Sequence, residues 1–101
     1  MKFFKILFSL TLFLLLSCNS KVVTIKKSYY AEIGKIKNDK KVGKWKYLFD
    51  DGKVFQIGRF KNNLETGEWK IYHSNGRLRQ EGNFKNGKID GLWKFYHENG
   101  I

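Results

Sequence analysis

A tryptophan-centred motif recurs every 24 residues, and this fixed period restricts the chain to a repeat architecture. Its three copies are Gly43-Lys44-Trp45-Lys46-Tyr47, Gly67-Glu68-Trp69-Lys70-Ile71 and Gly91-Leu92-Trp93-Lys94-Phe95. Three further columns keep the same spacing: Gly34, Gly58 and Gly82; Gly52, Gly76 and Gly100; and Ile36, Phe60 and Phe84. Because four independent columns agree, we interpret residues 28–101 as one domain of stacked equivalent units.

Each unit carries two turn signals. One series is Asn38-Asp39, Asn62-Asn63 and Asn86-Gly87, and the other is Asp51-Gly52, Asn75-Gly76 and Asn99-Gly100. These pairs tolerate the positive φ that two-residue type I′ turns require at both central positions. The segments between them are rich in aromatic and β-branched residues. The sequence therefore predicts an all-β, elongated antiparallel meander with strands near 29–37, 40–49, 53–61, 64–73, 77–85 and 88–97.

Period-two alternation assigns the side chains of each strand to two faces. We expect the tryptophan side to be the core, where a glycine across from an indole leaves room for the ring. The predicted repeat core comprises Trp45, Trp69, Trp93, Gly43, Gly67, Gly91, Phe60 and Phe84. Alternation also places Val54 and Leu78 on this face.

The opposite, back face is predicted to change along the chain, from apolar in the first units to charged around Arg77, Arg79 and Glu81. Its apolar residues Ile33, Val42, Phe55 and Ile57 are candidates for a partner-binding patch. Two lysine columns are anion-binding candidates: Lys46, Lys70 and Lys94, and Lys37, Lys61 and Lys85. Neighbours within a column lie about 9.6 Å apart by strand spacing. The columns fit either a diffuse basic stripe or a solubilising face that opposes aggregation.

Residues 1–17 have the composition of a signal peptide. Lys2 and Lys5 precede an apolar run, Ile6 to Leu16, which is shorter than the roughly 20 residues needed to span a bilayer. The run ends in Leu15-Leu16-Ser17-Cys18 and resembles bacterial lipoprotein signal peptides, in which such a cysteine is diacylated. The resemblance implies a lipid anchor at Cys18 and a location in the bacterial cell envelope. Residues 18–27 then form the lipidated N-terminus and a short tether, in which the β-branched run Val22-Val23-Thr24-Ile25 is a candidate first or edge strand. The alternative is an ordinary cysteine that ends an uncleaved anchor.

Net charge indicates which class of partner the chain favours, and the cysteine count shows whether a disulfide can form. The formal net charge is +11 and falls to +9 without Lys2 and Lys5, which favours anionic partners such as phospholipid headgroups or an acidic protein. Nucleic acid is also an anionic partner, but an envelope location makes it the least expected one. Cys18 is the single cysteine, so the chain cannot form an internal disulfide.

Nothing in the sequence assembles a catalytic or metal site. His73 and His97 occupy equivalent positions one repeat apart, about 9 to 10 Å by strand spacing, which is too far to share a zinc ion. The carboxylates occupy non-equivalent columns, and no Ser/His/Asp or Cys/His arrangement is available. We therefore predict a protein without cofactor or metal that is not an enzyme.

The Gly-x-Trp-Lys-x-Tyr units, followed by Asn-Gly and then Gly-x-Phe-Lys-Asn, resemble MORN repeats of the bacterial variant often grouped with antitoxin-like proteins. The resemblance covers residues 28–101 and implies a curled single-layer sheet used for protein or lipid contact. The favoured hypothesis is a membrane-anchored interaction module; the alternative is an antitoxin- or immunity-like inhibitor. The last predicted strand has an open edge, ranked as a docking site below the apolar patch, and the oligomeric state is left open.

Overall fold

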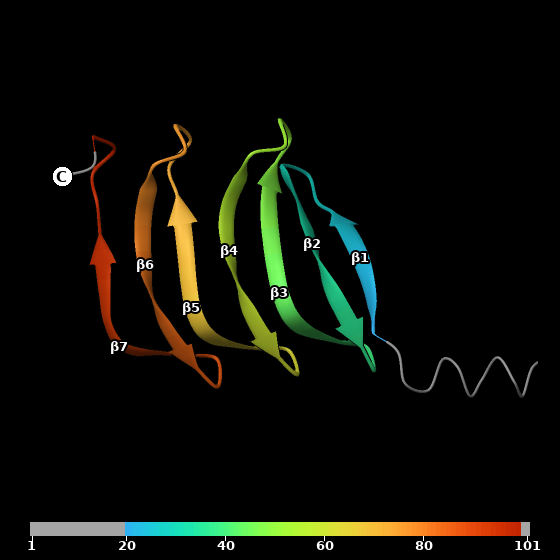
Figure 1. The fold of residues 1–101 in the computed structure, drawn as a ribbon. Helices are drawn as coiled ribbons and strands as arrows, with labels where there is room; N and C mark the ends of the chain where they lie inside the picture. Colours follow the sequence, from blue (N-terminus) through green and yellow to red (C-terminus); the bar gives the residue numbers. More distant parts are fainter. Residues whose placement is uncertain (1–19, 100–101) are drawn as a thin grey trace, which may run out of the picture.

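The computed structural model describes residues 20–99, and every regular element in this range is a β-strand (Figure 1). The seven strands are β1 (Lys21–Lys26), β2 (Tyr30–Lys37), β3 (Lys40–Phe49), β4 (Val54–Lys61), β5 (Leu64–Tyr72), β6 (Leu78–Lys85) and β7 (Lys88–Phe95). They form one open antiparallel sheet in the order of the chain. The predicted all-β meander is confirmed. The predicted signal peptide and Cys18 lie outside the described residues.

The two turn series differ in conformation. Asn62 and Asn63 both have positive φ, 49° and 71°, as a type I′ turn requires, and the equivalent pairs in this series do the same. In the other series Gly52 and Gly76 are left-handed, at 87° and 88°, whereas Asp51 and Asn75 before them are not. There the Gly52 N–H donates to the Phe49 carbonyl at 2.9 Å, and Asp51 Oδ1 accepts the Lys53 N–H at 2.9 Å. These loops are therefore three-residue turns that close on a glycine, and the type I′ prediction is wrong for them.

This three-residue loop shifts the register and corrects two face assignments. Tyr47 pairs with Gln56 but Leu48 pairs with Val54, so Phe55 is an extra, bulged residue. Val54 consequently lies on the back face. Phe55 lies on the core face, 4.5 Å from Phe49 between ring centroids. The same shift between β5 and β6 pairs Leu78 with Tyr72 on the back face and makes Arg79 the extra residue.

The motif glycines Gly43, Gly67 and Gly91 adopt a left-handed backbone conformation. Their φ values are 68°, 68° and 78°, and no atom lies within 4 Å of a Cβ built on any of them. Each sits where the register changes by two, which bends β3, β5 and β7 near their starts (Figure 1). These glycines therefore supply the left-handed residue that the bend needs.

The second glycine column makes room for the tryptophans. A Cβ on Gly34, Gly58 or Gly82 would lie 2.1, 2.0 or 2.4 Å from an indole carbon of Trp45, Trp69 or Trp93. Each indole therefore lies flat over the preceding strand. Between the indoles stand the edge-on rings of Phe60 and Phe84, in the order Trp45, Phe60, Trp69, Phe84, Trp93. This aromatic row is the core of the sheet, which has no second layer within residues 20–99.

The row is covered best at its N-terminal end. Trp45 is fully buried, Trp69 is 3% exposed, and Val23 and Ile25 of β1 pack against the cluster. Val22–Ile25 thus belong to a strand that extends the sheet.

Candidate anion-binding site on the back face

Basic side chains gather on the back face of β3, β4 and β5. Lys44 lies directly opposite Arg59, and Ile57 lies directly opposite both Lys46 and Lys70. Like charges placed directly opposite each other destabilise a sheet. A cross-strand pair of cations is therefore a feature that fold stability does not explain.

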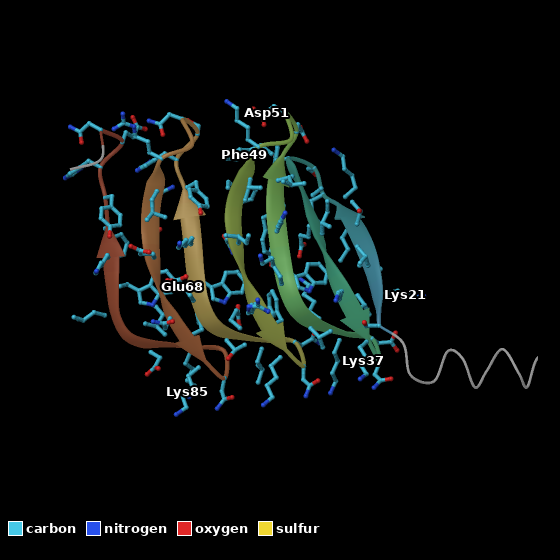
Figure 2. The ribbon with its side chains drawn as sticks, viewed as in Figure 1. Lys21, Lys37, Phe49, Asp51, Glu68 and Lys85 are labelled. Atoms are coloured by element: carbon cyan, nitrogen blue, oxygen red, sulfur yellow. The ribbon has the colours of Figure 1, made fainter. Side chains whose placement is uncertain are left out.

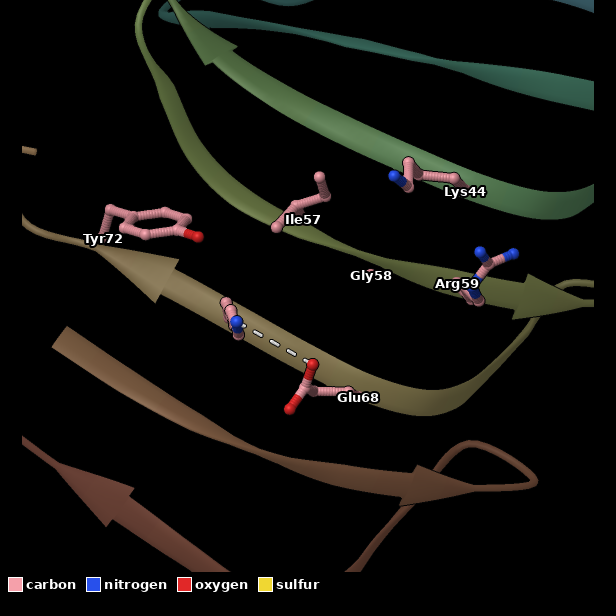
Figure 3. Close-up of a pocket in the computed structure, with 7 residues that line it drawn as sticks. Lys44, Ile57, Gly58, Arg59, Glu68 and Tyr72 are labelled. Carbon is pink, nitrogen blue, oxygen red and sulfur yellow. Dashed lines mark ion pairs between the residues drawn. The ribbon is translucent and has the colours of Figure 1, made fainter. Parts of the chain in front are cut away.

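A hollow of about 340 Å³ lies on this face, among Lys44, Arg59 and Lys70 (Figure 3). Its lining comprises Lys44, Ile57, Gly58, Arg59, Glu68, Lys70 and Tyr72. The hollow is open to solvent and shallow, as expected for one face of a single-layer sheet.

One carboxylate faces the cations of this hollow. Glu68 lies 3.9 Å from Lys70 Nζ, with its side chain 65% exposed, so the pair contributes at most about 1 kcal/mol. Within residues 20–99, no carboxylate lies at ion-pair distance from Lys44 or Arg59. The hollow therefore carries uncompensated positive charge, next to the aromatic Tyr72. An anionic group of phosphate or carboxylate size fits this arrangement.

The two predicted lysine columns lie in different parts of the back face, and one of them is interrupted. Across the back face the in-register row reads Lys46, Ile57, Lys70, Glu81, Lys94. Lys70 lines the hollow, and Lys46 lies outside its lining, opposite Ile57. Glu81 separates Lys70 from Lys94. The column of Lys37, Lys61 and Lys85 lies at strand ends, away from the hollow, with Lys37 and Lys85 at the lower rim in Figure 2.

Glu81 is also engaged by its own neighbour. Its Oε2 accepts a hydrogen bond from the Tyr96 hydroxyl at 2.8 Å, and this bond raises the pKa of Tyr96 above its ordinary value. The back face of β6 and β7 is consequently closer to neutral than that of β3 to β5. Sequence reasoning missed Lys44 and Arg59, because spacing around the three-residue loop alone places Gly58 opposite Lys44, and the bulge at Phe55 shifts the register by one residue.

The predicted apolar patch is not continuous. Ile33 and Ile57 are both paired with Lys46, which stands between them, and Val42 is paired with Lys35. Phe55, the fourth member, is wrongly assigned, because the bulge turns it to the core face against Tyr30, Tyr47 and Phe49. The half-buried isoleucines therefore alternate with lysines and do not form a surface of their own.

Other groups with potential chemistry have structural partners. The Nε2–H of His73 donates to the Tyr96 carbonyl at 3.0 Å, and His97 is exposed. Among residues 20–99, no three His, Cys, Asp or Glu side chains lie close enough together to hold a metal ion. The same part of the chain contains no helix of the length and apolarity needed to cross a membrane.

Comparison with known proteins identifies the repeat. The family model for the MORN repeat variant matches residues 41–62, 65–86 and 89–101, more than half of the chain. The matched segments begin within β3, β5 and β7 and, in the two longer matches, include the returning strand. No curated protein and no solved structure matches the chain. The chain belongs to the family of the MORN repeat variant.

Proposed function

We propose that this chain is a non-enzymatic interaction module of the bacterial cell envelope, and that its back face binds anionic headgroups at a membrane surface. The observation that carries the proposal is the directly opposed pair Lys44 and Arg59, which has no carboxylate partner within residues 20–99. An anionic ligand would relieve the repulsion between the two cations. MORN repeat membership supports a binding role in general.

The expected lipid anchor supports a headgroup as the ligand. Cys18 lies three residues before the start of β1, so an extended tether spans about 10 Å. Basic residues at that distance from an anionic leaflet gain about 1 kcal/mol each. Anchor and basic hollow would then act together, each too weak or unspecific alone.

Binding to lipid vesicles tests the proposal. A chain that starts at Asn19 should bind phosphatidylglycerol vesicles, should ignore phosphatidylcholine vesicles, and should be released as salt rises. Lys44→Gln with Arg59→Gln removes two charges, or about 2 kcal/mol, and should weaken binding about thirtyfold. Cosedimentation measures the fraction bound.

Lys37→Gln with Lys61→Gln is the matched control, because it removes two back-face charges away from the hollow. This control should lose much less affinity than the hollow variant. Equal losses would mean that charge acts diffusely and would remove the assignment to the hollow. Equal binding to neutral vesicles would remove the headgroup proposal altogether.

The antitoxin- or immunity-like alternative stays a prediction that no contact in the described residues favours. It requires a cognate toxin whose activity the chain suppresses. Protection that persists in the Lys44→Gln, Arg59→Gln variant would favour inhibition through another surface.

A further inference from the structure

The hollow on the back face holds a carboxylate as well as cations. Lys44 and Arg59 line it from β3 and β4, and Glu68 lines it from the next strand, β5 (Figure 3). A carboxylate in a site for anions repels every ligand that brings only negative charge. Binding of a plain anion therefore does not explain why Glu68 lies here.

The cation pair and this carboxylate are not bound to each other. Within residues 20–99, Glu68 forms its ion pair with Lys70, and no carboxylate lies at ion-pair distance from Lys44 or Arg59. Gly58, which lies on the strand between Lys44 and Glu68, contributes no side chain to the hollow. The Glu68 side chain is 65% exposed, so its oxygens can accept hydrogen bonds from a ligand. One ligand can therefore contact the two cations and the carboxylate together.

Comparison of the three units shows that a carboxylate at this position is specific to the second one. The motif position of Glu68 is occupied by Lys44 one period earlier and by Leu92 one period later. The motif thus accepts a cation, a carboxylate or an apolar side chain at this exposed position. Repeat packing therefore does not explain Glu68, and a role toward a ligand does.

We propose that Glu68 determines the specificity of this hollow and that the ligand is a phosphate ester of a polyol, such as a glycerol or sugar phosphate. The inference rests on the proposed function, because it takes Lys44 and Arg59 as the phosphate site. A guanidinium suits phosphate, since it donates two parallel hydrogen bonds to it. Glu68 accepts hydrogen bonds from the hydroxyl groups of the same ligand. Tyr72, at the wall of the hollow, offers its ring to the carbon skeleton.

Charge balance favours hydroxyl groups over an ammonium group as the donor to Glu68. Three cations, Lys44, Arg59 and Lys70, and one carboxylate leave a formal charge of +2 in the hollow. A phosphate monoester carries about 1.5 to 2 negative charges at neutral pH and compensates most of this charge. An ammonium group on the ligand would restore one positive charge, whereas hydroxyl groups add none.

A matched pair of soluble ligands tests the inference. Glycerol 1-phosphate and propyl phosphate have the same carbon chain and differ in two hydroxyl groups. Each is titrated into the full chain in neutral detergent micelles, and the nuclear magnetic resonance signal of the Gly58 amide, whose residue lines the hollow, reports binding. We expect glycerol 1-phosphate to bind about fivefold more tightly, because hydrogen bonds to a charged acceptor are the stronger ones.

Glu68→Leu separates the carboxylate from the phosphate site. Leucine occupies this motif position in the third unit, so the fold should be retained. The variant should bind propyl phosphate at least twofold more tightly, since a repelling charge is gone, and should lose the preference for glycerol 1-phosphate. A merely structural role of Glu68 would weaken the binding of both esters equally. The matched control is Asp90→Leu, which removes a back-face carboxylate outside the hollow and should keep the fivefold preference.

Vesicles distinguish a lipid headgroup from a free ester as the source of the polyol phosphate. Phosphatidylglycerol and phosphatidylpropanol carry the same charge and differ in the hydroxyl groups of the headgroup. A preference for phosphatidylglycerol that Glu68→Leu removes would assign the ligand to a lipid headgroup. A preference confined to the soluble esters would assign it to a free polyol phosphate.

Two results would overturn the inference. Equal binding of the two soluble esters, or a preference that survives in Glu68→Leu, would remove the role of Glu68. Phosphoethanolamine that binds more tightly than ethyl phosphate by a similar factor would replace the polyol by an ammonium ligand. Both results leave the proposed function standing, because that proposal depends on the loss of vesicle binding in Lys44→Gln with Arg59→Gln. Equal binding to neutral vesicles would remove the headgroup proposal and would leave the ratio between the soluble esters unchanged.

Discussion

Trp45 and Trp93 occupy the same position of the same motif, yet they differ in burial and in hydrogen bonding. Trp45 is fully buried, and its Nε1–H donates to the carbonyls of Lys35 and Val42, both at 3.2 Å. Trp93 is partly exposed at the last strand, with one hydrogen bond, to the Asn83 carbonyl at 3.2 Å. Trp45 is covered by preceding strands on one side and by Phe60 on the other, whereas within residues 20–99 Trp93 has a ring contact with Phe84 alone. A repeat therefore needs neighbours on both sides to bury its own tryptophan.

The first unit adds a cover that the others lack. Lys41 lies 4.6 Å from the centroid of the Trp45 ring and 5.0 Å from that of Phe60, and forms an ion pair with the buried Glu32. Cation–π contacts of this kind contribute about 0.5 to 2 kcal/mol, depending on desolvation. One repeat period later, position 41 corresponds to Glu65, and then to Ile89, which is exposed. The N-terminal half is thus sealed by a polar group that the C-terminal half lacks.

The largest effect that separates the two regions is expected at the glycines beneath the indoles. Gly58→Ala places a Cβ 2.0 Å from Trp69, which cannot move because Phe60 and Phe84 flank it. Gly82→Ala meets Trp93, whose outer side is open. We expect Gly58→Ala to lower the free energy of unfolding by about 3 kcal/mol or more, and Gly82→Ala by about 1 kcal/mol. Urea denaturation followed by tryptophan fluorescence measures both.

Equal losses for the two alanine variants would mean that the C-terminal end is as tightly packed as the centre. That result would contradict the comparison between Trp45 and Trp93.

A smaller effect is expected at the bulge of the first three-residue loop. Phe55→Lys inserts a charge among Tyr30, Tyr47 and Phe49 and should cost about 2 to 4 kcal/mol. The equivalent residue in the next unit is Arg79, which is exposed, so Arg79→Lys should change stability by less than about 0.5 kcal/mol. Thermal unfolding followed by circular dichroism reports both. A stable Phe55→Lys variant would restore the back-face assignment of this residue.

The smallest effect concerns alkaline pH. Burial, and then the negative charge of Glu32, raise the pKa of the Tyr47 hydroxyl well above its ordinary value of 10.0. Folded Tyr47 thus holds its proton more tightly than unfolded Tyr47. Its contribution to the free energy of unfolding is therefore complete below pH 10 and is lost as pH rises above 10. The later units have Ile71 and Phe95 at this position.

Tyr47→Phe should therefore flatten the fall in the free energy of unfolding between about pH 10 and pH 11. Tyr29→Phe is the control, because Tyr29 is 80% exposed. If the free energy of unfolding falls equally steeply with pH in the wild type and in Tyr47→Phe, folding does not raise the pKa of this hydroxyl.

Several features of the fold could be read from residue patterns. The 24-residue columns predicted the strands and their order, because turn residues and alternation act over a few neighbouring positions. The glycine column at Gly58 was correctly expected to lie on the tryptophan face. The error at Phe55 arose because one bulged residue reverses the alternation for the start of a strand, and loop conformation fixes that bulge.

The candidate site was partly predictable. The pattern indicated a basic back face that included Lys46 and Lys70, but it missed the opposition of Lys44 and Arg59. It also suggested equal lysine columns, although Glu81 interrupts one of them in register. Cross-strand neighbours depend on register, and the register shifts within every strand pair from β2–β3 to β6–β7.

The sequence by itself therefore determined the architecture, since a period of 24 residues with paired turn signals admits an antiparallel meander and little else. Only the tertiary structure decided which tryptophan is fully buried and which cations lie opposite each other without a carboxylate partner within residues 20–99. The physical reason is that propensity and turn conformation are local properties of neighbouring residues. Burial and charge compensation depend on what the adjacent strand brings to the same face.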